Sequence, residues 1–168
     1  MNAGMPRHLL LRLAALDLVT AALDSVVSPV QRCEDDAMRD RAVIVCARIG
    51  QHREQAFHLT VGGERLDLSR DDKASRRYTR QIEAMRAEIS RGWEGETVNA
   101  TAFLASVITV VAEAEEQLPD RAAYAPHREA WGALHSALAE LYEIFDPEYE
   151  DEAGIHHGAS VGERMVPV

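Results

Sequence analysis

Cysteine and aromatic side chains are scarce in this sequence, and each shortage limits what the chain can be. Cys33 and Cys46 are its two cysteines, too few for a disulfide framework, and they lack the close spacing of a metal-binding cysteine pair. We therefore expect two buried free thiols. Aromatic residues make up only 5% of the chain, so the core must rely on leucine, valine, isoleucine and alanine.

Uninterrupted apolar segments long enough to cross a membrane are also missing. Arg12 and Asp17 break the leucine-rich segment near the N-terminus, and no clean cleavage site for a signal peptidase follows it. The sequence therefore predicts a cytoplasmic protein that has neither a signal peptide nor a membrane partner.

Positive charge is in short supply. The formal net charge is −10, and Lys73 is the one lysine. Because nucleic-acid backbones bind positively charged surfaces, general nucleic-acid binding is excluded. An acidic chain of this kind is expected to have a protein partner.

The chain does contain enough apolar material for one folded domain. Hydrophobic residues make up 46% of its 168 residues. We expect a single helical domain at residues 1–146. Residues 147–168 are acidic and then rich in glycine and histidine, which predicts a flexible C-terminal tail.

Apolar residues recur every three or four positions through most of the domain, which indicates amphipathic helices. Pro29 is expected to end the first helix, and Thr97 or Asn99 to cap the fourth. The predicted fold class is mainly α, a bundle of about five helices. Their expected positions are about residues 7–28, 30–58, 71–91, 98–118 and 126–145.

Two stretches depart from this pattern. The run "AVIVCA" at residues 42–47 suits either a buried strand or a helix, and the charged residues around it favour the helix. Apolar and polar residues then alternate on both sides of Gly62 and Gly63. This alternation predicts a short β-hairpin near residues 57–69.

Opposite charges are concentrated in two segments, which we treat as candidate interaction residues. The basic ones lie in or next to the third predicted helix, and they are Arg70, Lys73, Arg76, Arg77 and Arg80. The acidic ones lie in the tail, and they are Glu148, Glu150, Asp151 and Glu152. Because opposite charges attract, we expect the tail to contact the basic helix of its own chain or of a neighbouring copy.

Four acidic residues resemble the metal site of a known enzyme family. Glu113-x-x-Glu116 followed by Glu143-x-x-Asp146 resembles the paired motifs of the MazG-type all-α nucleotide pyrophosphohydrolases. The resemblance covers about residues 110–146 and implies that these carboxylates bind Mg²⁺, which in turn binds substrate phosphates. Helical geometry points these acids away from the apolar stripes, which favours a solvated acidic face with no metal or cofactor.

Glu115 and His127 are the candidates for a buried polar pair. Both fall on the apolar stripes of the last two predicted helices, and an antiparallel arrangement would bring them level with each other. Such a pair serves either as a structural hydrogen bond or as a pH-sensitive group.

Trp93, between Gly92 and Gly95, is either a binding anchor or a lid over the end of the third helix.

Together these patterns favour a non-catalytic, acidic helical module that acts through protein–protein contacts, including self-association as a homo-oligomer. The alternative is a Mg²⁺-dependent nucleoside triphosphate pyrophosphohydrolase of the MazG type.

Overall fold

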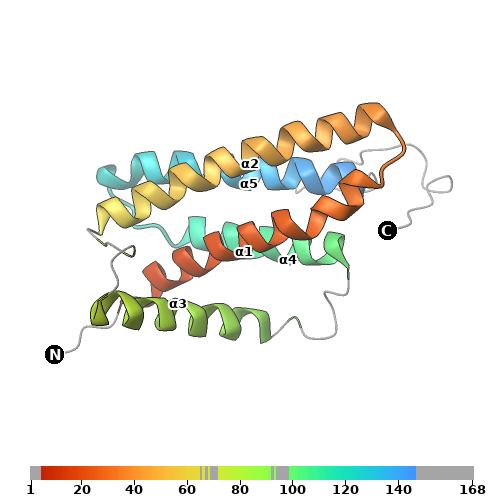
Figure 1. Cartoon of the computed structure of the whole chain (residues 1–168). Helices are drawn as coiled ribbons and strands as arrows, with labels where there is room; N and C mark the ends of the chain where they lie inside the picture. The colour runs from red at the N-terminus through yellow and green to blue at the C-terminus, as the bar shows by residue number, and fades with distance from the viewer. Residues whose placement is uncertain are drawn as a thin grey trace.

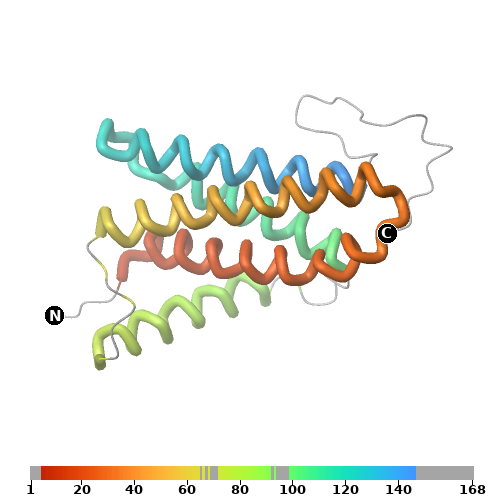
Figure 2. Tube along the Cα trace, turned by 45° about the horizontal axis from the view of Figure 1, so that its top comes forward, coloured from red at the N-terminus to blue at the C-terminus, as the bar shows by residue number. Residues whose placement is uncertain are grey.

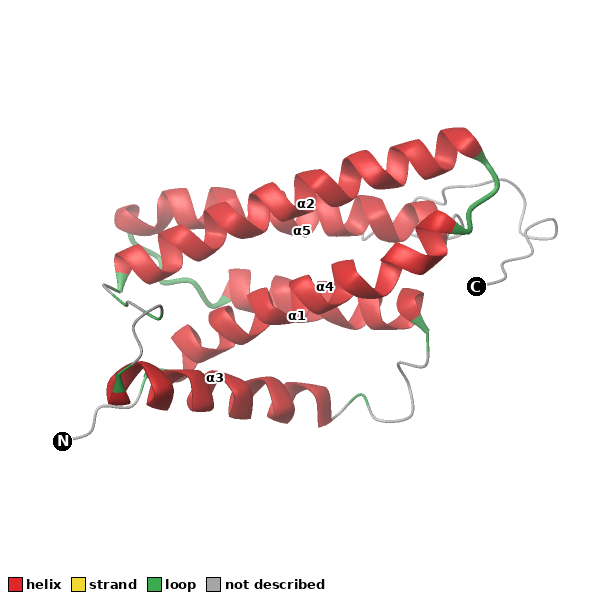
Figure 3. Ribbon diagram, in the orientation of Figure 1, coloured by secondary structure: helices red, strands yellow, loops and turns green. Residues whose placement is uncertain are grey.

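A computed structural model of the chain describes residues 5–64, 66, 68, 72–91, 93 and 99–146. These residues form five α-helices and one 3-10 helix, and no strand occurs among them (Figures 1 and 3). The prediction of about five helices is therefore confirmed. The elements are α1 (Arg7–Gln31), α2 (Asp36–Gly63), α3 (Lys73–Arg91), α4 (Ala100–Glu116), η1 (Ala122–Tyr124) and α5 (Ala125–Phe145).

Four of the helices form a ring around the main core. Helix α1 packs against α2 and α4, and α5 packs against the same two helices, so α1 and α5 lie diagonally opposite each other. Helix α3 lies outside this ring and packs on α1 (Figures 1 and 2). No helix within the described ranges is both long enough and apolar enough to cross a bilayer.

Helix α1 is covered by three neighbouring helices, which explains why it is apolar on nearly all sides. Leu11 and Leu13 point in almost opposite directions, yet both are buried. Pro29 was expected to end this helix, but α1 continues to Gln31. A proline so close to the C-terminus removes one hydrogen bond only, and Arg32 N–H closes the last turn by donating to the Ser28 carbonyl.

Asp35 caps the N-terminus of helix α2, and its side chain accepts a hydrogen bond from Met38 N–H at 3.1 Å. It includes the ambiguous run at residues 42–47, so the helical interpretation is confirmed. Six consecutive apolar residues cannot all face one side of a helix. Ala42 and Val45 point into the core, whereas Val43 and Ile44 are exposed.

The predicted β-hairpin near residues 57–69 is wrong over residues 57–63, which form the last two turns of α2. Phe57 and Val61 are four residues apart, so in a helix they share one face, and both pack against a second apolar cluster beneath α3. Gly62 and Gly63 lie at the C-terminal end of the helix. Leu66 N–H donates to the Val61 carbonyl at 2.8 Å just beyond this end.

Helices α4 and α5 pack side by side and run in opposite directions (Figure 1). Asn99 caps α4 by accepting a hydrogen bond from Ala102 N–H at 2.8 Å, as one of the two expected caps. The apolar stripe of α5 is almost completely buried, with Trp131, Leu134 and Leu138 each at 0% exposure. These two helices therefore supply much of the main core.

Candidate interaction site

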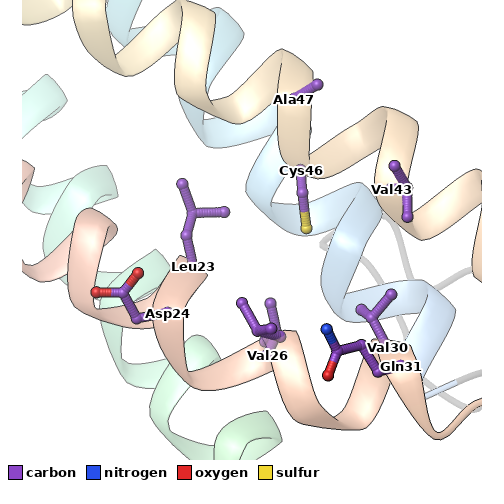
Figure 4. A pocket seen from close by; sticks show the side chains of 9 residues that line it. Leu23, Asp24, Val26, Val30, Gln31, Val43, Cys46 and Ala47 are labelled. Atoms are coloured by element: carbon purple, nitrogen blue, oxygen red, sulfur yellow. The ribbon is translucent and has the colours of Figure 1, made fainter.

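A shallow apolar groove of about 390 Å³ lies between the C-terminal half of α1 and the N-terminal half of α2. Figure 4 shows Leu23, Val26 and Val30 on the α1 side, with Val43 and Cys46 on the α2 side. Asp24 is among the few polar residues that line it. The two helices meet side by side, so this surface is built from rigid elements rather than from a loop.

Two large exposed hydrophobic side chains, Val27 and Val43, line this groove, and a third, Ile44, follows Val43 on α2. Val27 is 48% exposed, Val43 is 54% exposed and Ile44 is 60% exposed, and no other large apolar residue in the described ranges is exposed. Single exposed apolar residues are common on protein surfaces, but a cluster beside a groove is typical of a contact site. We call Val27, Val43 and Ile44 the apolar patch.

Cys46 lies on the wall of this groove, where its thiol is half-buried. Burial raises the pKa of this thiol, so less of it is thiolate at neutral pH. Cys33, in the connection between α1 and α2, is also half-buried and free. The expectation of free thiols is confirmed, but neither thiol is fully buried.

Charged residues flank the apolar patch along α2. Asp40 lies one turn before Ile44 and is exposed, and it has no ion-pair partner within the described part of the chain. Arg48 lies one turn after Ile44 and donates to Glu140 of α5 at 2.7 Å. Arg41 approaches the same carboxylate at 3.9 Å, so Glu140 lies between two arginines.

The basic residues predicted as an interaction surface are partly described. Lys73, Arg76, Arg77 and Arg80 are all exposed in the first half of α3, whereas Arg70 lies outside the described residues. The acidic residues Glu148, Glu150, Asp151 and Glu152 of the tail lie outside them as well.

The position of α3 bears on the expected contact between these charges. The basic half of α3 is at the end of the bundle where α2 ends, and α5 ends at the opposite end (Figures 1 and 2). The 19 residues of α3 span about 28 Å at the usual rise per residue. A tail that contacts the basic residues of its own chain must cross much of this length. Both forms of this contact, within one chain and with a neighbouring copy, stay predictions.

The four carboxylates of the proposed Mg²⁺ site do not lie together in one chain. Glu113 and Glu116 are exposed in the last turn of α4, whereas Glu143 and Asp146 are at the far end of α5. Because α4 and α5 run in opposite directions and Glu115 contacts His135, the eight residues from His135 to Glu143 hold the two pairs about 12 Å apart along the axis of α5. Glu143 also approaches Arg41 at 4.0 Å. In the described ranges no three His, Cys, Asp or Glu side chains are grouped as metal ligands.

The predicted pair between Glu115 and His127 is wrong. Glu115 approaches Nδ1 of His135 at 3.5 Å, two turns further along α5. Residues 117–124, which include η1, separate α4 from α5, so the first turn of α5 lies beyond the level of Glu115. His127 packs instead on Tyr124, with ring centroids 4.9 Å apart, and it lies beside Gly63 at the end of α2.

A buried polar cluster surrounds His127, and its main member is Arg12 of α1. The Arg12 side chain is only 2% exposed, and its closest carboxylate oxygen, on Glu64, is 3.9 Å away. Its Nη2 is 3.1 Å from Nδ1 of His8, so this His8 nitrogen must accept the hydrogen bond and the ring is protonated on Nε2. Within the described residues, Nη1 of Arg12 and Nδ1 of His127 have no hydrogen-bond partner.

Electrostatics in this cluster follow from its burial. Desolvation lowers the pKa of Arg12, although the charge of Glu64 opposes the shift. Desolvation also lowers the pKa of His127, and the positive charge of Arg12 adds to this effect. His127 is therefore uncharged at neutral pH, and no carboxylate of the described residues is close enough to activate it as a base.

Trp93 lies next to the main core rather than standing free. Its ring meets that of Phe103 edge to face, with centroids 5.9 Å apart, and its backbone N–H donates to the Ser90 carbonyl at 2.9 Å. This position matches the lid over the end of α3 better than the binding anchor. The residues on both sides of Trp93 lie outside the described part of the chain.

Sequence reasoning missed the apolar patch, although a signal was present. The run at residues 42–47 is too long to be buried by one face of a helix, so a helical interpretation already required exposed residues at Val43 and Ile44.

No family model, curated protein or solved structure matches the chain.

Proposed function

We propose that the chain is a non-catalytic interaction module that binds an apolar helical face of a partner protein at the groove between α1 and α2. One observation carries this proposal: Val27, Val43 and Ile44 are the exposed large hydrophobic residues of the described chain, and two of them, Val27 and Val43, line the groove, while Ile44 follows Val43 on α2. Covering apolar surface stabilises a complex by about 25 cal/mol per Å² removed from water.

The shape of the surface suggests the kind of partner. A groove between two helices accepts a third helix whose apolar residues recur every three or four positions. Its walls are apolar and its lining includes the small residue Ala47, so a helix can approach closely. The net charge of −10 keeps polyanions away from the chain as a whole.

The enzymatic alternative has weaker support. A MazG-type site needs the two pairs of carboxylates around one metal, and in a single chain α5 holds them about 12 Å apart along its axis. Glu143 and Glu140 are also engaged with arginines of α2. We therefore do not propose a catalytic role.

The test compares two charge-altering variants of the same helix. Ile44→Glu places a carboxylate in the apolar patch, whereas Gln55→Glu adds one at an exposed position about three turns away. Each purified protein is passed through extract of the native source, the captured proteins are identified, and binding is repeated with purified components. We expect wild type and Gln55→Glu to form a stoichiometric complex, with themselves or with another protein, that Ile44→Glu loses. If all three proteins form the same complexes, the apolar patch is not the binding site.

A further inference from the structure

The apolar patch has features of a surface that pairs with itself. Val27, Val43 and Ile44 are the only large exposed hydrophobics in the described ranges, so no other described surface of this chain offers an apolar face to cover them. An isologous contact, in which the same patch from two copies meets across a two-fold axis, covers both patches at once.

The charges around Ile44 are arranged with the symmetry that such a contact needs. Asp40 precedes Ile44 by one helical turn and Arg48 follows it by one turn, so the three side chains share the outer face of α2. When two copies of this helix pack antiparallel with Ile44 at the centre, each Asp40 faces the Arg48 of the other copy. The two-fold axis therefore places opposite charges on both sides of the apolar contact.

Both charged residues are available for this pairing. Asp40 is exposed and unpaired among the described residues. Arg48 is half-exposed, and its contact with Glu140 involves Nη1 alone. A guanidinium has five N–H donors, so Arg48 can bind a second carboxylate without releasing Glu140.

Small residues permit the helices to come close. Ala37 and Ala47 lie near the same outer face as Ile44, and both are exposed. Interfaces of this kind pair a few large apolar anchors with small or polar neighbours that exclude water.

We propose that the partner at this surface is a second copy of the chain, with α2 packed antiparallel on α2 about a two-fold axis near Ile44, and with Asp40 of each copy opposite Arg48 of the other. The proposal rests on the function proposed above and specifies its partner. It places the interface on α2, apart from the basic half of α3.

The test exchanges the charges between two full-length variants. Asp40→Arg carries two positive residues at the contact, and Arg48→Glu carries two negative ones, so each variant alone repels itself. In an equal mixture, the introduced arginine of one chain faces the introduced glutamate of the other, and the remaining Asp40 faces the remaining Arg48. We expect native mass spectrometry and sedimentation to show a wild-type dimer, at least about tenfold weaker dimers for each variant alone, and a recovered heterodimer in the mixture.

Two controls keep the test decisive. Glu34→Arg is the same charge reversal at an exposed position in the α1–α2 connection, and it should dimerise like wild type. Arg48→Glu removes the partner of Glu140, so thermal unfolding of each variant is measured first. If Arg48→Glu does not fold, the comparison of Asp40→Arg with Glu34→Arg decides the question, because only the former should weaken the dimer.

The outcomes separate this inference from the proposed function. A wild-type chain that stays monomeric but binds another protein, with Ile44→Glu abolishing that complex, overturns the second copy and leaves the interaction module intact. A wild-type dimer that neither Asp40→Arg nor Ile44→Glu weakens places self-association elsewhere and also overturns the inference. A monomer without any partner at the groove removes both proposals.

Discussion

Arg12 of α1 and His127 of α5 both lie at the C-terminal end of α2, Arg12 beside Glu64 and His127 beside Gly63, although their own helices are diagonal in the ring. Neither side chain has a close carboxylate among the residues that the structure describes. Glu64 approaches Arg12 no nearer than 3.9 Å, and Nδ1 of His127 has no partner among the described residues. Protonation of His127 would therefore put a second positive charge next to a buried guanidinium.

The first prediction concerns the dependence of stability on pH. Burial, and then the charge of Arg12, lower the pKa of His127 in the folded chain below its ordinary value of 6.5. The unfolded chain therefore binds a proton at a higher pH than the folded chain does. This contribution to stability is fully present above about pH 6.5 and is lost as the pH falls toward the lowered pKa.

Urea unfolding between about pH 8 and about pH 5 measures this effect. His127→Gln should show a smaller loss of stability on acidification than wild type. His58→Gln, which alters an exposed histidine of α2, should keep the wild-type loss. Identical pH profiles for wild type and His127→Gln would show that His127 does not titrate in this way.

The second prediction concerns the stability that Arg12 contributes. A buried charge with incomplete hydrogen bonding costs desolvation that its contacts do not fully offset, so Arg12→Met should leave the free energy of unfolding unchanged or raise it by up to about 2 kcal/mol. Leu16→Ala, one turn along the same buried helix, should lower it by about 2–5 kcal/mol. A clear loss of stability in Arg12→Met would mean that the polar cluster stabilises the fold.

The third prediction tests the contribution of α5 to the core. Leu138 is fully buried, and Leu138→Ala should lower the free energy of unfolding by about 2–5 kcal/mol because it leaves a cavity. Ser136→Ala, at an exposed position two residues earlier, should change it by less than about 0.5 kcal/mol. Chemical denaturation of both variants is sufficient, and a cost for Leu138→Ala no larger than that of Ser136→Ala would contradict the packing.

The fourth prediction uses two glycines inside helices. A Cβ at Gly50 of α2 meets nothing within 4 Å, so Gly50→Ala should stabilise the chain by about 0.5–1 kcal/mol through helix propensity. A Cβ at Gly132 of α5 would lie 3.3 Å from Oε2 of Glu115, so Gly132→Ala should gain less. Thermal unfolding at one protein concentration gives the ranking, and the reverse order would refute it.

Much of the helical architecture could be predicted from spacing alone. Trp131, Leu134 and Leu138 recur at helical intervals, and all three are buried in α5. The hairpin failed because a short alternation such as Phe57, Leu59 and Val61 fits a strand and a helix equally well, and only the packing of α2 decides between them. The packing of α2 against its neighbouring helices therefore decided between strand and helix at residues 57–63.

The interior polar cluster could not be predicted, since it depends on how the helices are arranged. In the sequence, Arg12 interrupts an apolar run and suggests a solvent-facing position. In the fold, α2, α3 and α4 enclose α1 and leave that side chain no route to water. The Glu115–His127 pairing failed for a related reason. Residues 117–124 connect α4 to α5 and determine how far one helix is shifted along the other. The spacing of apolar residues within the two helices does not predict the conformation of that connection.

Helix α3 is attached differently from the other four helices. Its described backbone packs on α1 and lies outside the ring, and only Ser75, Ile82 and Met85 among its described residues are buried. An element fastened along one face can detach while the four remaining helices stay assembled, because its loss exposes the smaller cluster and leaves the main core closed. The amides of α3 should therefore exchange with solvent as a unit of their own, and a protease that acts on transiently opened chains should cut there before the ring unfolds.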